Sequence, residues 1–155
     1  MIPDLAVELV KKWEGLHKVD KATGLVHPYV CPAGVWTIGY GSTRLLDGSN
    51  VLPSTPPITK EQAEELMKFE LEKCVRTALF LSPILQWSQS RLSAISSFIF
   101  NLGWPAYRAS TLRRKVNEQE WEEAAEQIQR WVFAGGRKLP GLIARRKDEA
   151  QYLCP

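Results

Sequence analysis

A glutamate–glycine pair, Glu14-Gly15, ends the first amphipathic segment of the chain. Residues 3–14 repeat apolar side chains at helical spacing, and glycine commonly follows the last residue of a helix. The carboxyl of Glu14 would then face the negative end of the helix macrodipole, which favours its protonated form. A carboxylic acid that stays protonated near neutral pH can serve as the general acid in cleavage of a glycosidic bond. The competing interpretation is a capping or solvent-exposed glutamate without a catalytic role.

A second group of chemically useful residues lies in the stretch YVCPAGVWTIGYGST, residues 29–43. It predicts short strands at residues 29–31 and 35–41, joined by a three-residue loop in which glycine supplies the left-handed position. The thiol of Cys31 precedes this loop and the hydroxyl of Thr37 follows it. Trp36 is the tryptophan that we expect in a binding cleft, because aromatic rings are common in sugar-binding sites; a core position is the alternative.

The composition limits the classes of protein to which the chain can belong. It has 155 residues, of which 45% are hydrophobic and 24% charged, as expected for one globular domain with a real core. No apolar run is long enough to span a membrane, and the first residues lack the layout of a signal peptide, so we expect cytoplasmic synthesis and no stable membrane insertion. Three cysteines without a CxxC pair argue against a disulfide framework and against a metal site.

The net charge of +3 comes from residues 104–155, which hold ten basic and seven acidic side chains. This excess indicates either a solvated helical surface or a basic patch that faces an anionic partner. No nucleic-acid-binding motif accompanies it, so we expect no nucleic acid partner. A bacterial envelope is the other common polyanion.

The order of the predicted elements indicates an α+β fold, mostly helical, in a single domain of residues 1–155. A small β-hairpin lobe of about residues 16–58 follows the first helix, residues 3–14. A larger helical lobe of about residues 59–155 completes the domain, and we expect the cleft between the lobes to hold the substrate.

Local sequence signals predict where the helices of the helical lobe begin and end. Thr59 and Gln62 predict a capping box at the start of a helix, and Gly103 predicts the end of a buried one. Asn117 predicts the cap of a helix that runs to the glycines at 135–136, and Pro140 predicts the start of the last helix.

The sequence resembles the phage-type lysozymes, the endolysin muramidases of glycoside hydrolase family 24. The glutamate–glycine pair after an amphipathic helix, followed by an aromatic residue, a glycine turn and TIGYG, is similar to the signature of that family. The likeness continues in SFIFNLG, in STLRRKVNEQEWEEAAEQIQRW and in GLIARRKDEAQYL, and thus extends over nearly the whole chain. The resemblance implies a lysozyme-like fold with the hairpin as a wall of the active site.

The resemblance also implies roles for individual residues. Glu14 occupies the place of the general acid, while Cys31 and Thr37 occupy the places of residues that hold the attacking water. Asn101 matches a position that contacts sugar. Arg145 or Arg146 resembles the basic residues behind the cleft, which pair with the catalytic glutamate or with a muramoyl carboxylate.

Two departures from the family pattern concern the same region. The segment between Glu14 and Tyr29 is longer than usual, and Asp20 within it could be a substitute carboxylate or, as is common for loop aspartates, a turn former. Cys31 stands where the family usually has an aspartate. A thiol supplies no second fixed negative charge unless its pKa is lowered, but it can accept a weak hydrogen bond and help to position water.

The function that the resemblance implies is an endolysin, a peptidoglycan muramidase that hydrolyses the β-1,4 bond between N-acetylmuramic acid and N-acetylglucosamine. It would need no metal or cofactor, act as a monomer, and depend on a holin to reach the cell wall from the host cytoplasm. Two alternatives are a cysteine peptidase that uses Cys31 with His27, and a non-catalytic wall-binding module. Pro28 weakens the peptidase interpretation because it breaks the helical geometry that would bring those two side chains together.

Overall fold

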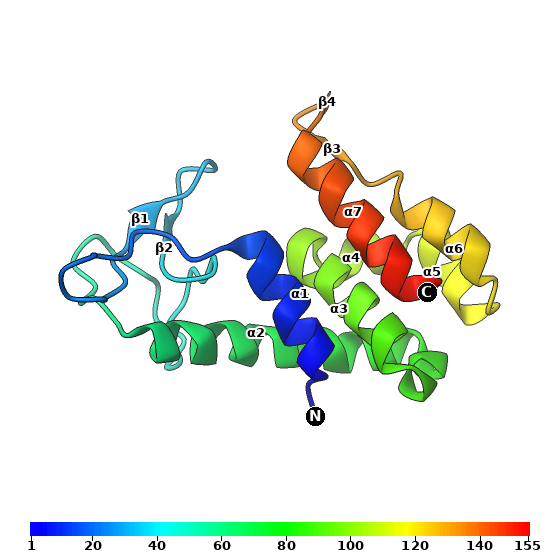
Figure 1. Ribbon diagram of the computed structural model, residues 1–155, viewed down its shortest axis with the longest axis horizontal. Coiled ribbons are helices and arrows are strands. Elements are labelled where there is room, and N and C mark those ends of the chain that lie inside the picture. The colour runs from blue at the N-terminus through cyan, green and yellow to red at the C-terminus, as the bar shows by residue number, and fades with distance from the viewer. The chain divides into compact units, whose positions relative to one another are not determined.

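The computed structural model describes residues 1–155 and is mostly helical, with two small antiparallel hairpins (Figure 1). The elements in chain order are α1 (Asp4–Glu14), β1 (Tyr29–Val30), β2 (Trp36–Thr37), α2 (Lys60–Leu81), the 3-10 helix η1 (Pro83–Trp87), α3 (Gln89–Leu102), α4 (Trp104–Arg108), α5 (Thr111–Asn117), α6 (Trp121–Ile128), β3 (Phe133–Ala134), β4 (Arg137–Lys138) and α7 (Pro140–Leu153). The α+β fold class is therefore confirmed. None of the helices combines the length and the hydropathy that a membrane span requires.

The chain divides into two compact units. One contains residues 11–70, and the other contains residues 1–10 and 71–155. Helices α1 and α2 each contribute residues to both units. We call the first the hairpin unit and the second the helical unit, and describe each by itself.

Turns and isolated bridges, more than regular strands, organise the hairpin unit. The backbone of Val26 pairs with both Val19 and Ile58, which ties the long segment after α1 into the unit. Within that segment the side chain of Asp20 accepts a hydrogen bond from the backbone N–H of Ala22 at 2.8 Å, so Asp20 forms a turn.

The first hairpin is shorter than the sequence indicated, although its loop is as expected. Cys31 donates its N–H to the carbonyl of Val35 at 2.9 Å, closing a three-residue loop in which Gly34 has a φ of +81°. β2 ends at Thr37 instead of residue 41, because Gly39 and Gly41 both take positive φ and turn the chain back on itself. Ile38 then pairs with Ser42 across this second turn.

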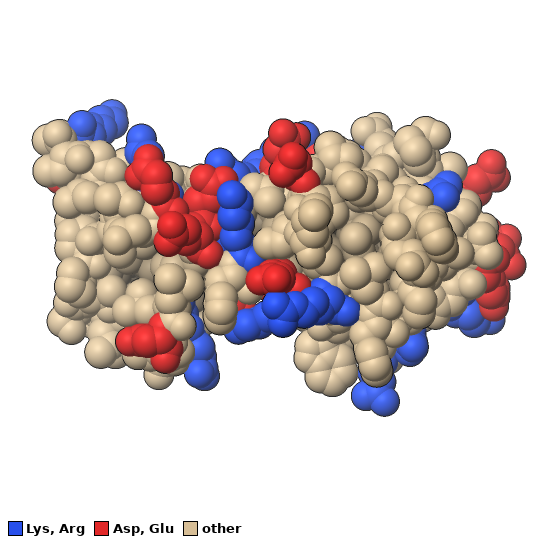
Figure 2. Space-filling view, turned by 90° about the horizontal axis from the view of Figure 1, so that it is seen from below, with Lys and Arg blue, Asp and Glu red and all other residues tan.

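Helix α2 begins with the predicted capping box. Gln62 accepts the backbone N–H of Thr59 at 2.9 Å, and Thr59 accepts that of Gln62 at 3.1 Å. Along the same helix, ion pairs four residues apart join Glu64 to Lys68 and Glu72 to Arg76. Basic and acidic side chains accordingly lie next to one another on the face shown in Figure 2.

The helical unit is built around α3, whose residues 92–99 are all buried. Gly103, with a φ of +89°, ends α3 as predicted, and α3 packs against α4 and α7. Phe98 at its centre makes edge-to-face contacts with Tyr107 and Trp131, at centroid distances of 6.2 and 5.4 Å. Helix α7 starts at Pro140 as predicted and packs beside α6, as Figure 1 shows.

Two expectations about this unit are wrong. Asn117 does not cap a helix: it is the last residue of α5, and its side chain donates to the carbonyl of Leu81 at 3.2 Å. The next helix, α6, starts at Trp121 and ends at Ile128, well before the glycines at 135–136. Both glycines have positive φ, the conformation that a two-residue hairpin turn requires, so they connect β3 to β4.

Candidate active site

Glu14 is the last residue of α1 and is half-buried. The helix ends there because Gly15 takes a φ of +70° while its N–H still donates to the carbonyl of Lys11 at 3.1 Å. Lys11, one turn earlier, forms an ion pair with Glu64 of α2 at 3.4 Å. The end of α1 is thereby fixed against the first turns of α2 within the hairpin unit.

The backbone of Gly41 forms a wall against the Glu14 carboxyl. A Cβ atom added at Gly41 would lie 3.3 Å from Glu14 Oε1, and the φ of +94° at Gly41 is one that other residues rarely adopt. The turn after β2 therefore approaches the carboxyl at backbone level. The positive φ, together with this contact, favours glycine at this position of the TIGYG segment.

The register of the first hairpin decides which side chains share a face. Tyr29 pairs with Thr37, and Val30 pairs with Trp36. Because neighbours on a strand point to opposite faces, Trp36 faces away from the Tyr29–Thr37 pair. Thr37 is only 2% exposed, and its hydroxyl donates to the carbonyl of Val35 at 2.9 Å. A role for Trp36 in substrate binding stays a prediction.

Cys31 lies within reach of this hydroxyl. The backbone N–H groups of Val35 and Ala33, with a smaller contribution from the Thr37 hydroxyl, hold the pKa of the Cys31 thiol below its usual range. The single hydroxyl hydrogen of Thr37 can thus point to the Val35 carbonyl or turn towards the sulfur. A thiol and a hydroxyl that share one hydrogen can together hold a water molecule.

Tyr29 connects these groups to the glutamate. Burial raises the pKa of Tyr29, and the charges of Cys31 and Glu14 raise it further. Its ring packs against that of His17 at a centroid distance of 5.1 Å, and His17 Nε2 lies 3.1 Å from the Glu14 carbonyl oxygen. Tyr29 therefore lies within electrostatic reach of both Glu14 and Cys31, and Cys31 lies within reach of the Thr37 hydroxyl.

Sequence reasoning missed Tyr29 and His17. Tyr29 lies as many residues before the three-residue loop as Thr37 lies after it. This equal spacing predicts that the two residues pair across the hairpin. The signal for His17 was weaker. It lies three residues after Glu14, about one helical turn further along the chain, where its side chain can reach the last carbonyl groups of the helix.

The remaining predicted site residues lie in the helical unit and form a buried ionic cluster. Arg145 and Arg146 are 4% and 0% exposed, and both pair with the fully buried Glu149, at 3.5 and 2.7 Å. Ser97 donates to Glu149 at 2.5 Å and also contacts Arg145 Nη2 at 3.2 Å. Burial raises the pKa of Glu149, and the guanidinium groups of Arg146 and Arg145 oppose that rise.

Asn101 is held by this cluster. Its side-chain oxygen accepts a hydrogen bond from Arg146 Nη2 at 2.6 Å, and the guanidinium of Arg146 lies over the ring of Phe98, 5.2 Å from the centroid. The bond fixes the orientation of the amide and leaves its NH₂ group to act as a donor. Burial of the two arginines favours a role in positioning Asn101 over direct contact with a ligand.

The cysteines form no disulfide, and the acidic residues form no metal cluster. All three cysteines are free thiols, and no group of three or more His, Cys, Asp or Glu side chains is arranged to hold a metal ion. The chemistry available in the hairpin unit is that of a carboxyl, a thiol, a phenol and a hydroxyl.

The chain is similar to known proteins over nearly its whole length. The sequence model of the family described as phage lysozyme matches residues 11–149. An endolysin of Acyrthosiphon pisum secondary endosymbiont phage 1 is 35% identical over 153 residues, covering 96% of this chain and 94% of the relative. A SAR-endolysin of Bacteriophage PS119 is 32% identical over 124 residues, covering 79% of this chain and 70% of the relative.

A solved structure, the endolysin from Escherichia coli O157:H7 phage FAHEc1, superimposes with a TM-score of 0.83 at 28% identity, covering 99% of this chain and 93% of that one. The resemblance predicted from the glutamate–glycine pair and the hairpin is thus confirmed, and the chain belongs to the phage lysozyme family.

Proposed function

We propose that the chain is an endolysin that hydrolyses the β-1,4 bond between N-acetylmuramic acid and N-acetylglucosamine in bacterial peptidoglycan, and so lyses the host cell. Membership of the phage lysozyme family and similarity to proteins known as endolysins support this function. The observation that carries it is the geometry of the hairpin unit, in which the Gly41 backbone lies against the Glu14 carboxyl and Thr37 pairs with Tyr29 across the hairpin beside Cys31. Glycoside hydrolysis requires a general acid and a second group, usually a carboxylate, on the opposite side of the bond. Here Glu14 would be the acid, and Cys31 with Thr37 would hold the water in place of the second carboxylate.

In this mechanism Glu14 acts as the general acid. Its carboxyl proton passes to the glycosidic oxygen, which leaves with the bonding electrons as the C–O bond breaks. A water molecule held by Cys31 and Thr37 forms the new bond to the anomeric carbon and loses one proton to the surrounding solvent or to the sulfur. The lowered pKa of Cys31 allows the thiol to carry part of the negative charge that an aspartate would provide.

Residues of the helical unit would bind the sugar chain. We propose that the NH₂ group of Asn101 donates to a sugar acetamide or hydroxyl, while Arg146 holds the amide in place through its 2.6 Å hydrogen bond. Arg145 and Arg146 would then support binding indirectly, since both are buried.

The peptidase alternative has less support. The groups that lower the Cys31 pKa are backbone amides and the Thr37 hydroxyl, whereas a cysteine peptidase requires a histidine base paired with its thiol. Digestion of purified peptidoglycan separates the alternatives. We expect new reducing ends ending in N-acetylmuramic acid and no new amino termini, measured by mass spectrometry of the products. New amino termini would indicate a peptidase, and binding without cleavage a non-catalytic module.

The same proposal includes the route to the wall. We propose that the enzyme acts as a monomer and depends on a holin for release from the host cytoplasm. A relative in Bacteriophage PS119 is named a SAR-endolysin, so the dependence on a holin needs its own test. For this test the chain is expressed in Escherichia coli with and without a holin. We expect lysis only when the holin is present. Prompt lysis without it would contradict this part of the proposal.

A further inference from the structure

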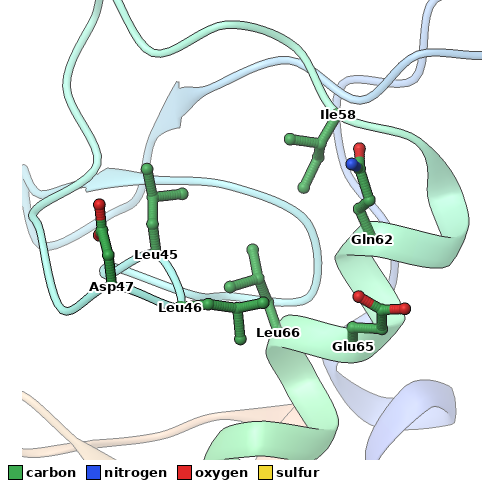
Figure 3. Close-up of a pocket in the computed structure, with 7 residues that line it drawn as sticks. All are labelled: Leu45, Leu46, Asp47, Ile58, Gln62, Glu65 and Leu66. Atoms are coloured by element: carbon green, nitrogen blue, oxygen red, sulfur yellow. The ribbon is translucent and has the colours of Figure 1, made fainter.

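A pocket of about 330 Å³ lies in the hairpin unit, apart from the residues of the candidate active site. The loop at residues 45–47 forms one side, and Ile58 with the first turns of α2 forms the other (Figure 3). The residues that line it are Leu45, Leu46, Asp47, Ile58, Gln62, Glu65 and Leu66.

The interior of the pocket is aliphatic. Side chains of Leu45, Ile58 and Leu66 point into the space between the loop and the helix, and Leu46 lies beside Leu66 (Figure 3). Leu46 is 53% exposed, so part of this apolar surface faces water. A hydrocarbon chain placed there would remove apolar area from water and gain free energy. No aromatic ring lines the pocket, which makes it unsuited to stacking a sugar.

The edge of the pocket is negatively charged. Asp47 and Glu65 lie on opposite sides of it, one on the loop and one on the helix (Figure 3). Asp47 Oδ1 accepts hydrogen bonds from the backbone N–H and the hydroxyl of Ser49 at 2.9 and 2.6 Å, and these bonds lower the pKa of Asp47. These hydrogen bonds favour the carboxylate form of Asp47.

Glu65 has no ion-pair partner, because Lys68 pairs with Glu64 instead. The amide of Gln62, which lies on α2 on the same side of the pocket as Glu65, uses its oxygen in the capping box with Thr59 (Figure 3). Its NH₂ group is left to donate to a carbonyl. The pocket thus offers an aliphatic interior, two carboxylates and one amide donor.

We propose that this pocket binds an aliphatic ammonium group, the side chain of a diamino acid in the peptide strands of peptidoglycan. The methylene chain packs on Leu46 and Leu66, the ammonium lies between Asp47 and Glu65, and Gln62 donates to a peptide carbonyl. The carboxylates exclude anionic groups, and a purely apolar ligand would leave both charges unused. This inference rests on the proposed function and adds a peptide subsite to it.

A small probe tests the chemistry of the pocket. Pentylammonium is titrated into the protein while the methyl resonances of Leu45, Leu46 and Leu66 are followed by NMR, with pentanol and methylammonium as controls. We expect pentylammonium to shift these methyl groups at concentrations at which neither control does. Equal binding of pentanol would mean that the pocket recognises only apolar groups and would overturn the proposal.

Matched variants locate the binding. Glu65→Gln should weaken pentylammonium binding by about twofold to fivefold, the range for an exposed ion pair. Glu61→Gln, which removes an exposed carboxylate one turn earlier on α2, should leave it unchanged. Leu46→Ala should weaken binding, whereas Leu52→Ala should not, although both leucines are 53% exposed. Equal effects within either pair would contradict a specific site.

The natural substrate gives the decisive comparison. Initial rates are measured on intact peptidoglycan and on glycan strands from which an amidase has removed the peptides. We expect Glu65→Gln and Leu46→Ala to raise KM on intact peptidoglycan by about twofold to fivefold with kcat unchanged, and to have no effect on stripped strands. If the unmodified protein cleaves both substrates and the variants match it on each, only the peptide subsite is wrong. If it cleaves neither, the proposed function itself fails.

Discussion

The two units differ in what holds their polar residues in place. In the hairpin unit, Glu14 and Thr37 are positioned by backbone turns, with glycines of positive φ at residues 15, 39 and 41 and strands of only two residues. In the helical unit, Arg146 and Glu149 are positioned by burial between packed helices. Glu14 is half-buried beside these turns, whereas Arg146 and Glu149 are fully buried and pair with each other.

The surroundings of a residue decide whether it can exchange a proton with a ligand or only stabilise the fold. A half-buried carboxyl beside a backbone turn can exchange a proton with a substrate. A carboxyl with no exposed surface between two guanidinium groups instead contributes to the stability of the fold. Substitutions in the two units should therefore affect different measurements, activity in one and the free energy of unfolding in the other.

The largest effect is expected at Glu14. Glu14→Gln keeps the shape of the side chain but removes the acidic proton, so release of reducing ends should fall by about 10²- to 10⁴-fold. The thermal unfolding curve should stay as in the unmodified protein. Glu8→Gln, an exposed carboxylate on the same helix, serves as the control and should keep full activity. An active and folded Glu14→Gln variant would contradict the muramidase mechanism.

The corresponding change in the helical unit is Glu149→Gln. It leaves Arg145 and Arg146 buried without their shared carboxylate, so the free energy of unfolding should fall by about 3–5 kcal/mol. Glu118→Gln, in the exposed cluster around Lys115, should change it by less than about 1 kcal/mol. Chemical denaturation monitored by circular dichroism measures both. Equal effects would mean that burial does not distinguish the two clusters.

The sequence predicted those features that are determined by a few consecutive residues. Glu14 at a helix end, the three-residue loop and the capping box at Thr59 each follow from a few consecutive side chains, and the structure contains all three. Asn117 shows the limit of such signals. An asparagine is common at either end of a helix, and its bond to Leu81, which is distant in sequence, decides where it lies.

Contacts between distant segments could not be predicted in the same way. The approach of the Gly41 backbone to Glu14 depends on the fold of the whole hairpin unit. Likewise, the bond from Arg146 to Asn101 depends on how α7 packs on α3. The family resemblance indicated these residues as important, but the structure was needed to pair the arginines with Glu149.

A substitution series at Cys31 distinguishes a thiol that holds water from a thiol that acts as a nucleophile. If the thiol helps to hold water, Cys31→Asp should keep or raise activity, Cys31→Ser should keep part of it, and Cys31→Ala should fall furthest, by about tenfold or more. Cys154→Ala, at an exposed position in the other unit, is the control and should have no effect. A folded but inactive Cys31→Asp variant would favour the peptidase, which cannot use a carboxylate as its nucleophile.

The pH at which Cys31 ionises tests the hydrogen bonds of the hairpin. Because the folded protein lowers the pKa of the Cys31 thiol, the thiolate forms at a lower pH than in an unfolded peptide. Ionisation of Cys31 therefore stabilises the folded state, and this stabilisation is lost as the pH falls through the pKa of the folded protein. The rate of alkylation by iodoacetamide, followed by mass spectrometry of the Cys31 peptide, should rise at lower pH in the folded protein. Thr37→Val should move that rise back towards higher pH, since it removes one of the groups that favour the thiolate. An unchanged profile would mean that the hydroxyl does not reach the sulfur.

The smallest effect is expected at the basic surface of the helical unit. Arg108 and Arg114 are exposed, lie beside Arg113 around a shallow pocket, and have no acidic partner. Binding to isolated cell walls, measured by cosedimentation, should weaken as salt rises, because surface attraction is screened over about 8 Å at physiological ionic strength.

Replacing both arginines by glutamine should weaken binding at low salt by about twofold to fivefold and flatten its salt dependence. The control replaces Arg137 and Lys138 of the exposed β3–β4 hairpin by glutamine, which removes the same net charge elsewhere in the unit. If both pairs weaken binding equally, the overall charge attracts the wall and the position of the arginines is irrelevant. If only the first pair does, the helical unit presents a basic surface to the wall in addition to its buried ionic cluster.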